Sequence, residues 1–336
     1  MTESEIEKTK IKHLVISGGG GTGFAYYGVL RESNKDGFWN VDDIKTVHGV
    51  SAGSFLAFSV TVLKHIGWDA YDDYIIKRPW ENDFSAEKLF NAYTNVGICG
   101  RETVESLFSP ILRAVDLSLN TTLQDLYDFT GIELHLYTTN LDTYEYIDLS
   151  HKTHPDWSII DAAYCSSAVP VIFRPNRING EVYVDGAFLC NYPLEQCMNH
   201  VENPDEIFGI NKISTNSNTK CLPFDSLGKE MIANSDTENP SSLEEKCEKY
   251  QNEKSETPEY GNIVDYLLDI IAKTVKKLTI EKTESKYTIN IIDKSTNAWE
   301  IYKALKSKES RSARIQYGVD SWNEYKKQIG FVNVNA

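Results

Sequence analysis

The chain has 336 residues, enough for one large domain or two small ones, and its hydrophobic fraction of 41% indicates a packed core. The formal net charge of −15 argues against nucleic acid as a partner, because the protein would repel phosphate groups. Residues 1–10 are polar and no apolar run reaches the roughly 18 residues of a membrane span, so we expect no signal peptide and a cytoplasmic protein, free or peripheral at membranes.

Two strand–turn–helix units open the chain. In each unit an apolar strand leads into glycines, and the glycines lead into an apolar stretch that is compatible with a helix. Consecutive units of this kind predict a parallel sheet with helices on both faces. The expected elements are a strand at 11–17, a turn at 18–23, a helix at 24–33, a strand at 46–48, a turn at 49–53 and a helix to about residue 65.

The rest of the chain alternates helices and strands around one polar interruption. Residues 214–260 hold 10 acidic and 5 basic residues with little apolar periodicity, which is typical of an insertion or a long loop. We expect one α/β domain over 11–326, a three-layer α/β/α sandwich with a mostly parallel central sheet, between a flexible N-terminus at 1–10 and a tail at 327–336. Its further elements are mixed helices over 68–130, strands at 132–139, 144–149, 181–184, 206–213 and 288–292, and helices from Ile159, over 263–281 and near Trp322.

Ser51 lies at the centre of the second turn, in a G-x-S-x-G pattern with Gly49 and Gly53. A nucleophilic serine of this kind stands on a strained turn between a strand and a helix, and the two glycines remove Cβ atoms that would clash there. The pattern also arises by chance, and an ordinary Gly/Ser turn is the alternative. The position between a predicted strand and an apolar helix favours Ser51 as a nucleophile.

The glycine run of the first turn has two functional interpretations. Gly18, Gly20 and Gly23 match the G-x-G-x-x-G pattern of a dinucleotide site. That site also requires an acidic residue at the end of the second strand, whereas the acidic residues at 42–43 precede the strand. The alternative is an oxyanion hole, in which glycine N–H groups donate to the charge that develops during acyl transfer. The pairing of the run with Ser51 favours the oxyanion hole.

A nucleophilic serine needs a base, and the chain offers a carboxylate and two histidines. Asp185 ends a predicted strand, and Gly186 permits a sharp turn that would aim the carboxylate at the edge of the sheet. A partly buried carboxylate takes the serine proton directly when burial raises its basicity. His200 would complete a Ser–Asp–His triad, but its stretch is polar and we expect a solvated side chain. His48 lies within a strand, where core packing is expected.

Neither a disulfide framework nor a metal site is indicated by the spacing of cysteines and histidines. The six cysteines include no C-x-x-C pair, and free thiols are expected in a chain that is not a small secreted domain. No zinc-ligand spacing is matched, so we expect no metal and no cofactor.

Together these motifs resemble the patatin-like phospholipase family. The family pattern is a glycine-rich turn, a G-x-S-x-G serine and a D-G-G/A aspartate, which here occupy 17–23, 49–53 and 185–187. The segment 163–170 resembles the one that precedes the aspartate strand in the family. The similarity runs from about residue 12 to 212 and resumes more loosely over 263–326.

The resemblance implies a Ser51–Asp185 dyad without histidine or metal, and an oxyanion hole formed by the N–H groups of Gly19 and Gly20. It implies hydrolysis of ester bonds in phospholipids or other acyl lipids, so the expected partner is a lipid or membrane-surface substrate; no protein partner is indicated. A general carboxylesterase with a Ser–Asp–His triad and a catalytically silent lipid-binding protein are the alternatives. The family often has Arg or Lys where this chain has Thr22, which leaves the headgroup preference open.

The predicted helix over 263–281 carries an apolar stripe with lysines near its C-terminal end. A stripe of this kind usually faces the core. The alternative is that the helix docks on a membrane surface and that the acidic stretch 214–260 shields it until lipid is present.

Overall fold

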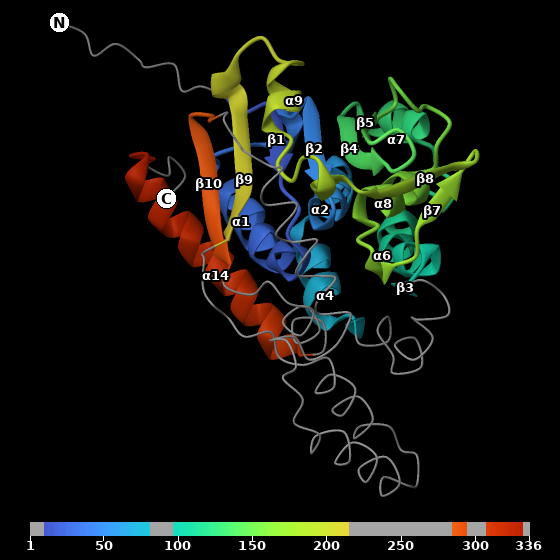
Figure 1. The fold of residues 1–336 in the computed structure, drawn as a ribbon. Coiled ribbons are helices and arrows are strands. Elements are labelled where there is room, and N and C mark those ends of the chain that lie inside the picture. The colour runs from blue at the N-terminus through green and yellow to red at the C-terminus, as the bar shows by residue number, and fades with distance from the viewer. Residues whose placement is uncertain (1–9, 81–96, 215–283, 294–306, 332–336) are drawn as a thin grey trace, which may run out of the picture.

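The computed structural model describes residues 10–80, 97–214, 284–293 and 307–331 (Figure 1). The predicted insertion and the predicted helix over 263–281 lie outside these residues, apart from Ser214, and both remain predictions. Among the described residues, none of the helices combines the length and the apolar character needed to cross a membrane.

A central eight-stranded sheet organises the domain, and five neighbouring strands of it run parallel. The other three strands join through antiparallel pairings: β5 and β8 each pair with β4, and β7 pairs with β8. The mostly parallel sheet expected from the sequence is confirmed. In spatial order the strands are β10 (Tyr287–Asp293), β9 (Ile207–Ser214), β1 (His13–Ile16), β2 (Thr46–Val50), β4 (Glu133–Asn140), β8 (Glu181–Asp185) and β7 (Asn176–Ile178), with β5 (Glu145–Leu149) beside β4.

Short elements that the sequence did not predict complete the β structure. A separate two-stranded parallel sheet pairs β3 (Gly97–Cys99) with β6 (Val171–Phe173). These strands and β7 have three residues each, too few to show a period-two pattern of apolar side chains. Strands β1, β2 and β4, in contrast, are buried almost throughout, and their apolar runs are visible in the sequence.

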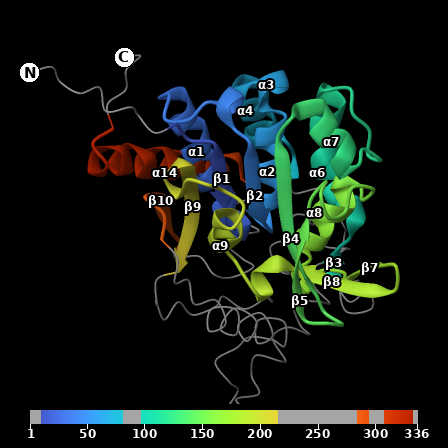
Figure 2. The same ribbon diagram turned by 90° about the horizontal axis from the view of Figure 1, so that it is seen from above.

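Helices flank the sheet unequally. Seen from above, α1, α2 and α4 lie on one side of the sheet and the short α9 lies on the other (Figure 2). The layered α/β/α arrangement is confirmed, with one face much more heavily covered by the described helices. The helices are α1 (Gly23–Lys35), α2 (Ala52–Thr61), α3 (Leu63–Ile66), α4 (Trp68–Lys77), α6 (Arg101–Ala114), α7 (Leu123–Thr130), α8 (Ile159–Ser167), α9 (Leu194–Met198) and α14 (Lys308–Gln328).

Two clusters of buried side chains divide the core between the faces. The larger cluster includes Leu14 and Ile16 of β1 and the apolar faces of the long helices. The alternate residue Val15 belongs to the smaller cluster, together with Leu194 and Cys197 of α9. Because successive side chains of a strand point to opposite faces, β1 contributes to both clusters and is completely enclosed.

The C-terminal helix α14 packs closely against α1. A Cβ atom on Gly318 would lie 1.9 Å from the carbonyl oxygen of Ala25, and one on Gly28 would lie 2.2 Å from that of Ile315. At the other end of the contact, Asp36 accepts a hydrogen bond of 2.7 Å from the indole of Trp322. The helix predicted near Trp322 is therefore confirmed, and it depends on glycine at the crossing point.

Candidate active site

Ser51 occupies a sharp turn between β2 and α2. Its backbone has φ 55° and ψ −124°, a region that residues other than glycine seldom adopt. Ser166 holds the turn in place: the Ser51 N–H donates to the Ser166 carbonyl oxygen at 3.1 Å and to the Ser166 hydroxyl at 3.2 Å. Side-chain exposure of Ser51 is intermediate, so a strained backbone presents a partly accessible hydroxyl.

The glycines on either side of Ser51 allow α2 to approach the strands. A Cβ atom on Gly53 would lie 2.5 Å from the carbonyl oxygen of Ile16 in β1. One on Gly49 would lie 2.6 Å from the carbonyl oxygen of Gly53. Both predicted motif glycines are therefore required sterically.

The glycine turn after β1 lies directly against the serine. A Cβ atom on Gly18 would be 3.2 Å from the Cβ of Ser51, and Gly20 has a positive φ of 52°. Among the described residues, no acceptor is hydrogen-bonded to the N–H groups of Gly19 and Gly20. These unpaired donors belong to the turn whose first glycine, Gly18, lies against Ser51. Gly23 begins α1, and a Cβ atom there would make only an ordinary contact, so its role in the motif is not steric.

Asn191 holds the glycine turn and was not singled out in the sequence. Its backbone oxygen accepts from the Gly18 N–H at 2.9 Å, and its side-chain nitrogen donates to the Gly18 oxygen at 3.2 Å. Ser166, which supports the serine turn, lies in the segment 163–170, for which the sequence alone suggested no role. The sequence signal for Asn191 is its place six residues after Asp185, followed by Tyr and Pro.

Asp185 ends β8 and is almost fully buried, with 1% exposure. Gly186 makes the following turn possible, since a Cβ atom there would lie 2.3 Å from the carbonyl oxygen of Tyr137. One carboxylate oxygen, Oδ1, accepts a hydrogen bond of 2.8 Å from the Ala187 N–H. The other, Oδ2, is buried and has no hydrogen-bond partner among the described residues.

Burial raises the pKa of Asp185 to about 6, while the nearby Ser51 hydroxyl and the hydrogen bond from the Ala187 N–H lower that pKa in part. Ser51 is therefore close enough to act on the carboxylate, although no hydrogen bond of normal geometry joins the two side chains in this structure. Such bonds are often long in the absence of substrate and shorten when it binds.

No histidine takes part in this arrangement. His48 is fully buried in β2, and its ring nitrogens bond to Thr46 Oγ1 at 3.0 Å and to the Tyr137 hydroxyl at 2.8 Å. The expected core role of His48 is confirmed. His200 is exposed, as expected, but its ring lies 5.3 Å from that of His135. No histidine contributes to the pKa of Asp185.

The four described cysteines are free thiols, as expected: Cys99, Cys165, Cys190 and Cys197. Burial raises the pKa of the Cys197 thiol to about 12, so this side chain is an unreactive core residue.

Ser51 on its strained turn, the glycine turn beside it and the buried Asp185 together make up the candidate site. The family model described as Patatin-like phospholipase matches residues 14–198, more than half of the chain, and contains all of these residues. The chain belongs to the patatin-like phospholipase family.

Two viral proteins are similar to this chain. It is 26% identical over 188 residues to "Probable lipid hydrolase 463L" of Invertebrate iridescent virus 6, covering 55% of this chain and 62% of that protein. It is 31% identical over 201 residues to "Uncharacterized protein R571" of Acanthamoeba polyphaga mimivirus, covering 57% and 63%. The matched region thus spans less than two thirds of either relative.

Solved structures resemble the chain more distantly. VipD from Legionella pneumophila has a TM-score of 0.46 at 17% identity, with 95% of this chain and 67% of that chain covered. The type III effector ExoU has a TM-score of 0.41 at 13% identity, with 95% and 53% covered.

Proposed function

We propose that the protein is a lipid acyl hydrolase in which Ser51 is the nucleophile and Asp185 is its base. The serine oxygen attacks the ester carbonyl carbon while Asp185 takes the hydroxyl proton, which passes to the departing alcohol. A water molecule, deprotonated by Asp185, then attacks the acyl-serine, releases the fatty acid and restores the serine. The N–H groups of Gly19 and Gly20 donate to the oxyanion in both steps.

The observation that carries the proposal is the partly unsatisfied carboxylate next to a strained serine. A buried oxygen without a hydrogen-bond donor is costly, and Oδ2 of Asp185 is such an atom. Hydrogen bonding from the Ser51 hydroxyl would satisfy it and would also orient the proton for transfer. The burial that makes the oxygen costly also raises the basicity of the carboxylate.

The substrate class rests on the family and on the relative named as a probable lipid hydrolase. We therefore propose ester bonds of phospholipids or related acyl lipids as the substrates. A catalytically silent lipid-binding protein is the less favoured alternative, since Ser51, Asp185 and the free glycine donors are all present.

Labelling with a fluorophosphonate tests the nucleophile without assuming the substrate. The wild-type protein and Ser59→Ala, a serine on α2 whose hydroxyl donates to the Phe55 carbonyl oxygen, should be labelled and should hydrolyse phosphatidylcholine vesicles or p-nitrophenyl esters. Ser51→Ala should be unlabelled and inactive while keeping the wild-type circular dichroism spectrum. Labelling or hydrolysis that persists in Ser51→Ala would contradict the proposal.

The triad alternative is tested by His200. With a Ser51–Asp185 dyad, folded His200→Ala should retain most of the esterase activity, because its ring contacts other histidines and not the dyad. Near-complete loss in the folded variant would favour a Ser–Asp–His triad.

A further inference from the structure

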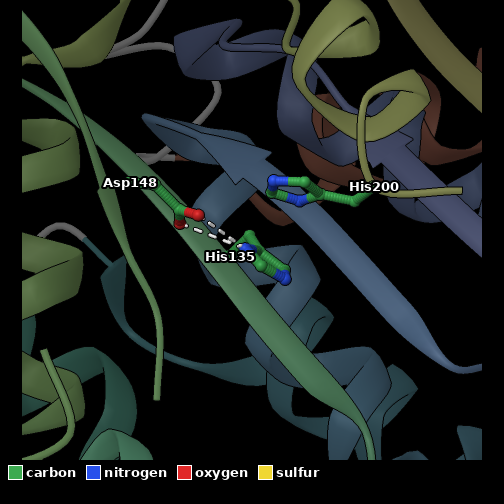
Figure 3. A group of neighbouring side chains, drawn as sticks. All are labelled: His135, Asp148 and His200. Atoms are coloured by element: carbon green, nitrogen blue, oxygen red, sulfur yellow. Dashed lines mark hydrogen bonds and ion pairs between the residues drawn. The ribbon is translucent and has the colours of Figure 1, made fainter. Parts of the chain in front are cut away.

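A cluster of three potential metal ligands lies on the face of the sheet that carries α9. His135 comes from β4, Asp148 from the adjacent antiparallel β5, and His200 from the residues just after α9 (Figure 3). One ligand atom from each side chain lies within 4.8 Å of those of the other two. The proposed dyad uses none of these side chains. The three residues do not match any metal-binding spacing in the sequence, so the sequence did not indicate this cluster.

The distances suit a small divalent cation. The His135 Nδ1 atom lies 2.9 and 3.1 Å from the two carboxylate oxygens of Asp148. Ligand atoms around a tetrahedral Zn²⁺ lie roughly 3.3–3.5 Å apart, because Zn–N and Zn–O bonds are about 2.0–2.2 Å long. The pair therefore needs only a slight opening to share an ion, and His200, whose ligand atom lies within 4.8 Å of the other two, would have to move by about 1.5 Å or less.

The surroundings of His135 match those of a metal-binding imidazole. The ring is almost fully buried, and its second nitrogen, Nε2, lies 3.4 Å from Glu133 Oε2. A histidine ligand commonly donates its other N–H to a carboxylate, which fixes the tautomer and the ring orientation. In the structure Nδ1 is hydrogen-bonded to Asp148, so a bound ion would replace the Nδ1 proton between these two side chains while Nε2 donates to Glu133. Lys152 holds Glu133 in place at 2.7 Å.

His200 provides an independent indication. Its ring lies against two other imidazoles, 5.3 Å from His135 and 6.2 Å from His48, yet no described side chain hydrogen-bonds to its nitrogens. His48 is not a ligand, because Thr46 and Tyr137 already occupy both of its nitrogens. Figure 3 shows the His200 ring beside the His135–Asp148 pair. His200 thus lies at the exposed edge of the cluster, and its nitrogens are accessible to an ion held by the other two side chains.

We propose that His135 Nδ1, the Asp148 carboxylate and a His200 ring nitrogen bind one divalent transition-metal ion of the Zn²⁺ class, with water as a fourth ligand. Two nitrogens and one carboxylate favour Zn²⁺ over Ca²⁺ or Mg²⁺, which require oxygen ligands. The ion ties the segment after α9 to the sheet.

Metal binding to the full-length chain, without a histidine tag and after removal of metals by a chelator, tests the proposal. Calorimetric titration with Zn²⁺ should show one equivalent bound to the wild type, with a rise in Tm, and no binding of Mg²⁺. His200→Ala and Asp148→Asn should bind at least 10-fold more weakly. His65→Ala, which removes an exposed histidine outside the cluster, should bind as the wild type does.

Two further measurements separate this site from adventitious binding at surface histidines. Co²⁺ should give the visible absorption of a tetrahedral nitrogen–oxygen site in the wild type and lose it in His200→Ala. Ser51→Ala should bind Zn²⁺ unchanged, since the site does not depend on the proposed hydrolysis. The proposal is overturned if the wild type does not bind Zn²⁺, or if both His200→Ala and Asp148→Asn bind Zn²⁺ as tightly as the wild type. Either result would show that His135 and Asp148 form a hydrogen-bonded pair without a metal.

Discussion

At the scale of single residues, the environment of Asp185 decides what the carboxylate does. An aspartate in water is ionised above its ordinary pKa near 4 and is then a weak base. Burial raises the pKa of Asp185 to about 6, because the ionised form loses hydration that the Ser51 hydroxyl and the Ala187 N–H only partly replace. The carboxylate is consequently a stronger base and remains ionised at neutral pH, as the proposed mechanism requires.

The raised pKa of Asp185 predicts the pH dependence of hydrolysis. The base must be unprotonated to accept the proton of Ser51, so kcat/KM should be constant above the pKa and fall tenfold per pH unit below it. We expect the acid limb near pH 6, measured as fatty acid release by mass spectrometry. Asp185→Asn should lower kcat by about 10⁴-fold at every pH. An acid limb near pH 4, or activity retained in folded Asp185→Asn, would exclude Asp185 as the base.

Asn191 gives a second prediction at this scale. Asn191→Ala keeps the backbone bond to Gly18 but removes the side-chain donor to the Gly18 oxygen. The glycine turn should then be less well positioned for the oxyanion, which lowers kcat by about 10–100-fold with little change in KM. Fluorophosphonate labelling should slow in parallel. Asn199→Ala, an exposed residue after α9, is the control, and equal kinetics in both variants would leave Asn191 without a positioning role.

At the scale of elements, glycines set how closely helices approach their neighbours. Gly53 brings α2 onto β1, and Gly318 brings α14 onto α1. In both places a Cβ atom would meet a backbone carbonyl oxygen, which cannot rotate away as a side chain can. Substitution should therefore separate whole elements and not merely disturb one contact.

The contact between α1 and α14 tests whether glycine is required where two elements approach closely. Gly318→Val should lower the free energy of unfolding by about 1–3 kcal/mol or more, because the added atoms overlap the Ala25 carbonyl oxygen. Ala313→Val adds the same side chain to an exposed position of the same helix and should cost well under 1 kcal/mol. Urea unfolding followed by circular dichroism compares the two. Equal midpoints would mean that the helices have room to separate without loss.

At the scale of the whole molecule, the two faces of the sheet have different chemistry. The described long helices cover one face with a large apolar cluster. On the α9 face the apolar cluster is small, and β2 and β4 present His48, His135 and Tyr137 there. The large apolar cluster on the heavily covered face stabilises the domain, and the more polar face holds the proposed metal site.

Much of this architecture was predictable from the sequence because its determinants are local. The buried strands, the glycine turns and the helices that follow them are neighbours in the chain, so strand β1, strand β2 and the Ser51 turn were all predicted. The family pattern added the pairing of Ser51 with Asp185. The observed boundaries of these elements differ from the predicted ones by only a few residues, because the ends of helices and strands fray.

Other features depend on which distant segments meet, and only the tertiary structure decided them. The antiparallel pairing of β8 with β4 places Asp185 opposite Thr138 and buries its carboxylate, which is the cause of its raised pKa. The contact of Asn191 with Gly18 and the meeting of His135 with His200 join segments with no shared sequence signal. The sequence determines which side chains are available for chemistry, whereas burial and proximity, which set their pKa values and partners, arise only when the sheet assembles.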